Sequence, residues 1–303
     1  MRVLVTGATG FAGRWLVREL TEAGHAVDGL PPSSELDVAD AGAVRERIVA
    51  TEPDVVAHLA ALASDQAVGA DPARAIRTMV DGTIAVVDAV TALARRPGLL
   101  LVSSAEVYQR PADGTPITES SALAPRGAYA WLKLAQERIA IAAAARDGLP
   151  LVVARPFNHA GPGQRPVGVV AAFARRVAAV RRGEADVVPA GNVDVERDIG
   201  DVRDVAVAYR LLLEGLGEGT LGRPPTTLNI ATGHAVRLRA IIEELCALAD
   251  VRPAIVADPS LVRADDPARV VGDASQLRRT TGWAPRIPLR RTLSDVLDGA
   301  MGG

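Results

Sequence analysis

Four side chains near the middle of the chain have types and spacing suited to proton transfer. The stretch LVSSAEVY places Ser104 and Glu106 directly after an apolar run, and YAWLK follows with Tyr129 and Lys133. Tyr129 and Lys133 are four residues apart, so they share one face of a helix. A tyrosine hydroxyl has a pKa of about 10, which a neighbouring ammonium lowers. The pattern predicts a tyrosine that exchanges a proton with a carbonyl oxygen near neutral pH.

Ser104 follows the run GLLLVS, at the carboxyl end of an expected parallel strand. Ligands bind at this end of such sheets, where Ser104 can donate a hydrogen bond to the same substrate oxygen. A Tyr-x-x-x-Lys pair alone occurs in many helices and predicts little. Its position after a strand-end serine and a glycine-rich N-terminal turn favours a catalytic role, with Lys133 also holding the ribose of a nicotinamide cofactor.

The N-terminal stretch VTGATGFAG places Gly7, Gly10 and Gly13 between an expected strand and an expected helix. Glycines at these places let the backbone turn tightly and let its N–H groups approach a pyrophosphate at the helix N-terminus. A tight turn without a ligand is the structural alternative. The G-x-x-G-x-x-G spacing differs from the G-x-G-x-x-G of ordinary dehydrogenases.

The stretch HAVDGLPP should carry the residue that contacts the adenosine ribose. Pro31 and Pro32 stand where an acidic residue is expected, Asp28 lies in the middle of the strand, and no Arg or Lys follows for a 2′-phosphate. The choice between NAD and NADP therefore stays open. Asp37 either accepts a hydrogen bond from the adenine amino group or caps the next helix.

The elements that must position these residues alternate between short apolar runs and longer amphipathic ones. Near-continuous apolar strands indicate a parallel sheet covered on both faces, so we predict an α/β fold with a Rossmann-type doubly wound sheet. Expected strands are 2–7, 25–30, 54–61, 98–104 and 149–156, and expected helices are 12–24, 40–53, 71–96 and 128–148.

The alternation breaks after about residue 160, and this break predicts a smaller C-terminal substrate-binding region. Here we expect a loop at 158–168, helices at 169–183 and 201–216, a surface loop at 214–226 and a strand at 226–233. We assign 1–160 and 197–233 to an NAD(P)-binding domain. Residues 161–196 and 234–303 are assigned to a region that binds the substrate.

The composition excludes several classes of protein. The formal net charge of the 303 residues is −2, so we expect no nucleic-acid partner and no anionic membrane surface as partner. The one cysteine, Cys246, is expected to be a buried thiol, and the lack of a disulfide partner fits a cytoplasmic protein. No apolar stretch reaches the roughly 18 residues of a membrane span, and the N-terminus does not resemble a signal peptide. We also expect no metal ion.

The motifs, taken in order, resemble the extended short-chain dehydrogenase/reductase family, the NAD-dependent epimerases and dehydratases. They cover nearly the whole chain and are TGATGFAG (6–13), HLAA (58–61), SSAEVY (103–108), Tyr129 with Lys133, RPFNHAGPGQ (155–164), RDIGDVRDVAVAY (197–209) and TGWAPRIPL (281–289). The last three are most similar to members that act on GDP-sugars. The resemblance implies NAD(P)H-dependent reduction of the C4 ketone of a nucleotide-linked 4-keto-6-deoxyhexose, in the first place GDP-4-keto-6-deoxy-D-mannose, which gives GDP-D-rhamnose.

The resemblance also implies roles for individual residues. Tyr129 donates the proton to the C4 oxygen, Ser104 polarises that oxygen, and Lys133 binds the nicotinamide ribose. Cofactor-binding positions are Gly7, Thr9, Gly10, Phe11, Ala12, Gly13, Asp37, Val38, Leu59, Ala60, Ala61, Tyr129, Lys133 and Pro156. Substrate-binding positions are Ser104, Glu106, Asn158, Gln164, Arg197 and Arg263.

Two positions depart from the family pattern, and one role has a structural alternative. Met79 stands where the family usually has Asn, and Ala264 follows Arg263 where the family usually has Pro. The first departure puts active-site geometry in doubt, and the second puts the role of Arg263 in doubt. Arg197 either meets the nucleotide's ribose or diphosphate or pairs with Asp198, Asp201 or Asp204.

Glu106 keeps a second activity open. In the family's sugar-nucleotide 4,6-dehydratases, a Glu at this spacing removes the C5 proton, and here Ser104, Ala105 and Glu106 fit that spacing. GDP-mannose 4,6-dehydratase or a C4 epimerase is therefore the alternative function. Ala105 argues against the dehydratases of dTDP sugars, which usually have Asp there. In the reductase, Glu106 would bind a sugar hydroxyl.

Two further expectations concern inactive relatives and assembly. A binding protein that has lost catalysis is the alternative from another class, but such proteins typically lose the Tyr or the Lys. The alanine-rich helix after Tyr129 either packs against its copy in a homodimer, as is common in this family, or only against the sheet of its own chain.

Overall fold

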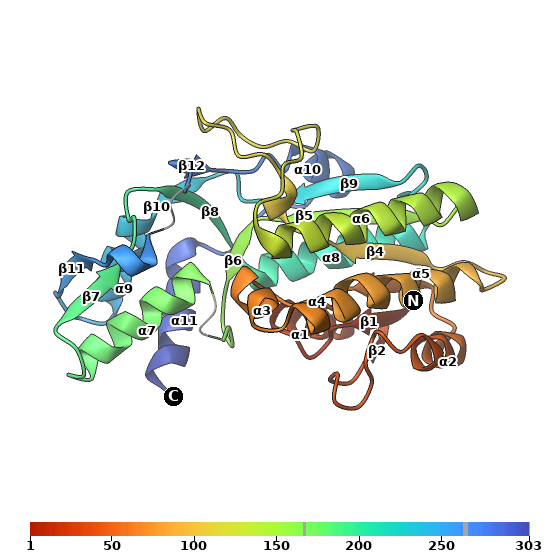
Figure 1. Cartoon of the computed structure of the whole chain (residues 1–303), viewed down its shortest axis with the longest axis horizontal. Helices are drawn as coiled ribbons and strands as arrows, with labels where there is room; N and C mark the ends of the chain where they lie inside the picture. The colour runs from red at the N-terminus through yellow and green to blue at the C-terminus, as the bar shows by residue number, and fades with distance from the viewer. Residues whose placement is uncertain (166–167, 263–265, 303) are drawn as a thin grey trace.

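The computed structural model describes residues 1–165, 168–262 and 266–302, and its larger part is a six-stranded parallel sheet between two helical layers (Figure 1). The strand order is β2-β1-β3-β4-β5-β9, and every neighbouring pair is parallel. The strands are β1 (Arg2–Thr6), β2 (Ala26–Gly29), β3 (Val55–His58), β4 (Gly98–Val102), β5 (Leu151–Pro156) and β9 (Thr226–Ile230).

Alternate side chains of these strands enter two separate cores. Val3 and Val5 of β1 pack on one face with α1 (Phe11–Glu22) and α8 (Val202–Gly217). Leu4 packs on the other face with α2 (Ala41–Thr51), α5 (Gly82–Thr91) and α6 (Gly127–Asp147). Because both faces are covered, the strands must be apolar throughout. The predicted doubly wound α/β fold is confirmed.

The helix expected over 71–96 is wrong as a single element. The structure divides this segment into α4 (Pro72–Ile76), a π-helical turn (Arg77–Asp81) and α5, preceded by α3 (Asp65–Ala70). The Thr83 hydroxyl donates a 2.6 Å hydrogen bond to Met79 O, a carbonyl that a regular α-helix would use for its own ladder. The π-turn adds one residue to the helical turn, and Met79 within it is completely buried.

A smaller part of the molecule lies at the left of Figure 1, around α7, α9 and α11. Its sheet has the order β10-β8-β12, with β6 also paired to β8, and a two-stranded sheet joins β7 to β11. The strands are β6 (Asn158–Ala160), β7 (Val187–Ala190), β8 (Glu196–Asp201), β10 (Ala235–Arg237), β11 (Ala254–Ala257) and β12 (Arg269–Val270). The helices are α7 (Val169–Arg181), α9 (Leu238–Leu248), α10 (Ser275–Thr281) and α11 (Leu289–Met301), with 3₁₀ turns at Ala105–Val107 and Pro259–Leu261.

Several local expectations are settled in this part and at its borders. The loop expected at 158–168 begins instead as strand β6, because its backbone pairs with Ile199–Asp201 of β8. The surface loop expected at 214–226 starts later, since α8 continues to Gly217. Cys246 is buried in the core of α7, α9 and α11, as expected. Among the described residues, no helix is long and apolar enough to cross a membrane.

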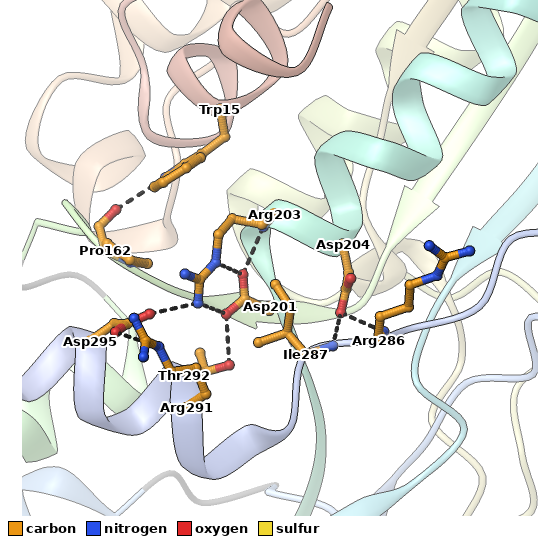
Figure 2. Close-up of polar contacts among 10 residues, drawn as sticks. All are labelled: Trp15, Pro162, Asp201, Arg203, Asp204, Arg286, Ile287, Arg291, Thr292 and Asp295. Atoms are coloured by element: carbon orange, nitrogen blue, oxygen red, sulfur yellow. Dashed lines mark hydrogen bonds and ion pairs between the residues drawn. The ribbon is translucent and has the colours of Figure 1, made fainter. Parts of the chain in front are cut away.

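Figure 2 shows the polar cluster that fastens α11 to the start of α8. The Arg203 guanidinium donates two 2.8 Å hydrogen bonds to the Asp201 carboxylate and forms a 2.7 Å ion pair with Asp295 on α11. The Thr292 hydroxyl, also on α11, donates to Asp201 at 2.7 Å. Asp201 is completely buried, so its charge is stable only because these partners surround it.

The same cluster reaches helix α1. The Arg203 guanidinium lies 5.9 Å from the centroid of the Trp15 ring, and Trp15 Nε1 donates to Pro162 O at 3.1 Å (Figure 2). We call Trp15, Asp201, Arg203, Thr292 and Asp295 the Arg203 junction. It connects α1 and α8, which pack on the large sheet, with Pro162 and with α11 of the smaller part.

Candidate active site

Most of the candidate residues lie at one edge of the large sheet, where the carboxyl ends of β1, β3, β4 and β5 meet. The order β2-β1-β3 reverses the direction in which the chain crosses the sheet, and ligands of open α/β sheets bind at such a switch point. After Pro156 ends β5, the chain continues through Phe157 into β6 of the smaller sheet. This edge therefore faces residues of both parts.

The glycine turn has the geometry that a dinucleotide needs. Gly7 has φ +70°, and a Cβ there would lie 2.8 Å from Ala60 N. A Cβ at Gly13 would lie 2.1 Å from Gly7 O, so no larger residue fits. Helix α1 starts at Phe11 with Gly10 as its N-cap, and no side chain caps it. The first N–H groups of α1 are thus left for an anion, which fits a cofactor pyrophosphate.

Near the end of β2, the structure shows what Asp28 and Asp37 contact. The Asp28 carboxylate forms an ion pair with Arg47 and accepts a hydrogen bond from the Thr51 hydroxyl, so both of its oxygens already have partners within the protein. Asp37 is exposed and accepts a 3.0 Å hydrogen bond from Ala39 N, whereas α2 is capped by Asp40, which accepts a hydrogen bond from Ala43 N. Asp37 therefore caps no helix.

Arg74 is a cation that the sequence analysis missed at this end. Its guanidinium donates a 3.4 Å hydrogen bond to the hydroxyl of Ser33, which follows strand β2. The two residues are 41 positions apart, and α4 brings Arg74 over the end of β2. Only the tertiary structure places a positive charge where the adenosine ribose of a dinucleotide lies in this class of fold.

Ser104, Tyr129 and Lys133 meet at the carboxyl end of β4. Ser104 is buried and interacts through its hydroxyl with Tyr129, which α6 presents from its first turn. Burial raises the pKa of Tyr129 to about 12, and the charges of Glu106 and Asp65 act in the same direction, against the Ser104 interaction. The expectation of a lowered tyrosine pKa is therefore wrong for this structure, because desolvation outweighs the favourable contact. Tyr129 is a protonated donor at neutral pH.

Lys133 is the only lysine among the 303 residues, since all other basic side chains of the chain are Arg or His. Its ammonium is buried and donates a 2.8 Å hydrogen bond to Val102 O at the end of β4. Burial lowers the pKa of Lys133 to about 7, opposed by the charge of Glu137. An arginine could not lose its proton at any ordinary pH, which gives a physical reason for a lysine here.

Behind Lys133 lies a chain of buried hydrogen bonds that the sequence did not indicate. Thr83, which donates to Met79 O, accepts a 2.8 Å bond from Gln136 and contacts His58 Nε2 at 3.0 Å. His58 Nδ1 lies 2.7 Å from the Thr6 hydroxyl. Since the Thr83 proton is already used, His58 Nε2 donates and Nδ1 accepts.

Within this chain His58 is neutral. Burial, followed by the charge of Lys133, lowers the pKa of His58 to about 3. Met79 contributes only its carbonyl, where the family usually has an Asn side chain. The side chains of His58, Thr83 and Gln136 come from β3, α5 and α6, and the bonds among them do not involve the Met79 side chain. These groups are 25 to 53 positions apart in sequence.

Glu106 forms an ion pair with Arg110, one turn further along the same loop. Glu106 N also donates a 3.2 Å hydrogen bond to Ser104 Oγ, so the carboxylate is held beside the catalytic candidates. Arg197 lies close enough to this pair for both of its charges to act on it. Arg197 itself binds Asp266 and donates to the carbonyls of Glu196 and Pro267 at 2.7 and 2.9 Å.

The alternative partners expected for Arg197 have other roles. Asp201 belongs to the Arg203 junction, and Asp204 accepts hydrogen bonds from Arg286 N and Ile287 N. Asp198 accepts three backbone N–H bonds and one hydroxyl bond, all from residues 232, 233 and 272. Arg197 is therefore held by Asp266, a partner that the sequence analysis did not consider.

The remaining candidates lie around this edge. Leu59, Ala60 and Ala61 follow β3, and Val38 packs against Gly82. Asn158 opens β6 and is exposed, Gln164 is partly buried in the following turn, and Pro156 closes β5. Arg263 lies outside the described residues. Phe11 stacks on His159 with ring planes 7° apart, a contact between glycine turn and β6 that the sequence did not indicate.

A glycine turn at a helix N-terminus, together with Ser, Tyr and Lys at the switch edge of a doubly wound sheet, defines a dinucleotide-dependent oxidoreductase of the short-chain class. The model of the NAD dependent epimerase/dehydratase family matches residues 3–231. The chain belongs to this family, which confirms the resemblance to the extended short-chain dehydrogenases/reductases. It is an NAD(P)-dependent enzyme, and its cofactor is NAD or NADP.

Individual relatives agree with this assignment. A GDP-6-deoxy-D-mannose reductase of Pseudomonas aeruginosa is 34% identical over 298 residues, which cover 98% of this chain and 96% of that protein. The structure of RMD from Pseudomonas aeruginosa complexed with NADPH matches with a TM-score of 0.88 at 33% identity, covering 99% of each chain. The UDP-glucose 4-epimerase of Thermus thermophilus, in complex with NAD, matches with a TM-score of 0.84 at 26% identity, covering 100% of this chain and 99% of that chain.

Proposed function

We propose that the protein reduces the C4 ketone of a nucleotide-linked 4-keto-6-deoxyhexose, namely GDP-4-keto-6-deoxy-D-mannose, to GDP-D-rhamnose. The observation that carries this proposal is the meeting of Ser104, Tyr129 and Lys133 at the switch edge, with the Ser104 and Tyr129 hydroxyls hydrogen-bonded to each other. A tyrosine that stays protonated is suited to give a proton to an alkoxide that forms at C4. The similarity to a GDP-6-deoxy-D-mannose reductase supports the same substrate.

The proposed roles follow from where the side chains lie. Ser104 donates a hydrogen bond to the C4 oxygen and orients the ketone, and Tyr129 delivers the proton to that oxygen. Lys133, held by Val102 O, binds the ribose of the cofactor and restores the tyrosine proton. Bound NAD(P)H supplies the hydride. Asn158, Gln164, Arg197 and Arg263 are proposed to contact the nucleotide sugar.

For the cofactor, we propose that NADPH is preferred to NADH. Asp28 is occupied by Arg47 and Thr51, so it does not accept a hydrogen bond from a 2′-hydroxyl. Ser33 and Arg74 at the end of β2 offer a hydroxyl and a guanidinium, which suit a 2′-phosphate. The other cofactor positions proposed are those of the glycine turn, Asp37, Val38, 59–61 and Pro156.

We also propose which residues bind the cofactor and which bind the substrate, and in what oligomeric state the protein exists. Residues 1–160 and 197–233 bind the cofactor, and residues 161–196 and 234–303 bind the nucleotide sugar. The protein is proposed to be cytoplasmic and to form a homodimer. The dimer is supported by exposed apolar side chains on the outer helices, Trp131 of α6 at 60% and Ile84 of α5 at 41%. The mass of the particle in solution, measured by light scattering for the wild type and for Trp131→Glu, tests the dimer.

The alternative is a GDP-mannose 4,6-dehydratase or a C4 epimerase, with Glu106 as the base. The observation that favours keeping it is the position of Glu106 beside Ser104 and Tyr129. These activities need no stoichiometric reduced cofactor. The two functions therefore differ in a simple measurement.

The test is a paired assay on the purified protein. One arm contains GDP-4-keto-6-deoxy-D-mannose with NADPH or NADH, and the other contains GDP-mannose with NADP⁺ or NAD⁺ only. We expect oxidation of the reduced cofactor and a new deoxyhexose in the first arm. A 4-keto product in the second arm, without net change of cofactor, would overturn the reductase and make Glu106 the C5 base.

A further inference from the structure

The loop after β4 carries a cation at the active-site edge that no role in the proposed reaction accounts for. Arg110 lies one turn beyond Glu106 and forms an ion pair with its Oε2. The Arg110 side chain is 15% exposed and the Glu106 side chain is 37% exposed, so the guanidinium is largely buried while the carboxylate remains open toward the space in front of the site. Among the described residues, the structure gives Arg110 no other ion pair.

Glu106 is placed where it can reach a substrate. Its backbone N–H binds Ser104 Oγ, and its charge acts on the Tyr129 hydroxyl. A carboxylate at this position can do two different things to a 4-keto sugar. It can accept a hydrogen bond from a sugar hydroxyl, or it can remove the C5 proton, which the adjacent C4 ketone makes acidic.

We propose that Arg110 decides between these two actions, holding Glu106 as a hydrogen-bond acceptor and preventing it from acting as the C5 base. This inference rests on the proposed reduction of a 4-keto sugar. Arg110 is a positioning residue that acts through Glu106 and determines which reaction the site performs.

The charges around the pair give the physical reason. Arg110 and Glu106 lie near a second pair, Arg197 with Asp266, and the charges of both Arg110 and Glu106 act on Arg197. The four groups together are neutral. The Arg110 guanidinium engages Glu106 Oε2 and holds the carboxylate in this pair, so that oxygen is not free to approach the C5 proton of a bound sugar.

Removing Arg110 reverses the balance. Glu106 and Asp266 would then share one cation, Arg197, and the cluster would carry a net charge of −1. Glu106 Oε2 would lose its Arg110 partner and would be free to approach the C5 proton. The C5–H bond would break, its electron pair would form the enolate at C4, and the proton would pass to the Glu106 carboxylate. Return of a solvent proton to C5 completes an exchange that needs neither oxidant nor reductant.

Exchange at C5 in D₂O measures this step alone. GDP-4-keto-6-deoxy-D-mannose is incubated with enzyme and NADP⁺, and loss of the C5 proton signal is followed by NMR against an enzyme-free sample. We expect slow exchange with the wild type, equal to that of Glu106→Gln. We expect Arg110→Met to accelerate it at least tenfold, and the double variant Arg110→Met/Glu106→Gln to return to the wild-type rate.

Further variants separate the charge from the fold. Arg110→Lys keeps the cation and should exchange as slowly as the wild type, and Gln109→Met is the control for a change in the same loop. If Arg110→Met fails to fold, Arg110→Gln takes its place. Unchanged exchange in the folded Arg110 variant, or wild-type exchange that is already fast and depends on Glu106, overturns the proposal.

Parallel measurement of NADPH oxidation keeps this proposal distinct from the proposed function. If the wild type does not reduce the ketone, the proposed function fails, whereas accelerated exchange in Arg110→Met still supports the role of Arg110. If the wild type reduces the ketone and Arg110→Met does not exchange faster, the proposed function stands and the role of Arg110 is refuted.

Discussion

The catalytic edge and the Arg203 junction both bury charged groups, but they treat those charges in opposite ways. At the junction, Arg203 meets the carboxylates of Asp201 and Asp295, and the hydrogen bond with Asp201 raises the pKa of Arg203. At the edge, Lys133 forms no ion pair with any described carboxylate, and burial lowers its pKa to about 7. The junction pairs its cation with carboxylates, whereas the cation of Lys133 at the edge has no such partner in the described part of the chain and a pKa near neutral pH.

This contrast distinguishes charged groups that stabilise the fold from groups that are suited to proton transfer. Matched charges stabilise a connection between elements, and their loss should reduce stability. Unmatched, desolvated groups are the ones that can exchange protons, and their loss should reduce turnover. Mutations in the two regions should therefore affect different observables.

The largest effect is expected for Tyr129→Phe. Loss of the proton donor should lower kcat/KM for the 4-ketone by about 10³-fold, within the range of general acid catalysis. The melting temperature should change little. Tyr209→Phe is the matched control, because its buried hydroxyl has no hydrogen-bond partner among the described residues. Full turnover by Tyr129→Phe would show that another group supplies the proton.

Arg203→Met should show the reverse pattern. It leaves the buried Asp201 without its cation, so the free energy of unfolding should fall by about 3 kcal/mol. Urea unfolding measures this loss. The control is Arg291→Met, which removes an exposed ion pair to Asp295 and should cost at most about 1 kcal/mol. Equal losses in the two variants would mean that the junction contributes no more than a surface pair.

Lys133 should titrate near neutral pH, and as the only lysine it can be observed alone. With ¹³C-labelled lysine, the cofactor-free protein should show a single side-chain resonance with a pKa of about 7. A value near 10 would contradict the argument from burial.

The same shift links protonation to stability. The folded pKa of about 7 lies below the unfolded value of about 10.4, so between these pH values the unfolded chain binds more protons. The free energy of unfolding should therefore rise with pH over this range by up to about 1.4 kcal/mol per pH unit, and this contribution is lost as the pH falls toward 7. Lys133→Met should remove this slope, measured by urea unfolding, whereas Arg203→Met should keep it.

The smallest effect is expected at the exposed outer end of the edge. Arg74→Ala should weaken NADPH binding about tenfold and leave NADH binding unchanged, because one charge-assisted contact to a 2′-phosphate is lost. Quenching of intrinsic fluorescence gives both dissociation constants without turnover. Arg138→Ala on α6 is the control for a loss of surface charge. A similar loss for both cofactors would assign Arg74 a structural role.

The sequence was sufficient for features that are local in the chain. Gly7, Gly10 and Gly13 fall within one turn, and Tyr129 and Lys133 within another, so spacing alone predicts their geometry. The apolar strands also predicted the doubly wound sheet, because strands that are buried on both faces consist almost entirely of apolar residues. The π-turn at Met79 was not predictable, because it accompanies a hydroxyl bond from Thr83 and the burial of Met79, which no local spacing records.

The amino-acid order alone was enough to specify the class of enzyme, the succession of its elements and the residues most suited to chemistry, including one lysine in a chain that otherwise uses arginine. The electrostatic state of those residues was set by the folded arrangement instead. The pKa values of Tyr129 and Lys133 depend on burial. The contacts of Arg74 with Ser33, of Asp266 with Arg197 and of Thr292 with Asp201 join residues that are 41, 69 and 91 positions apart. Desolvation and long-range pairing arise from packing, which no local pattern of residues records.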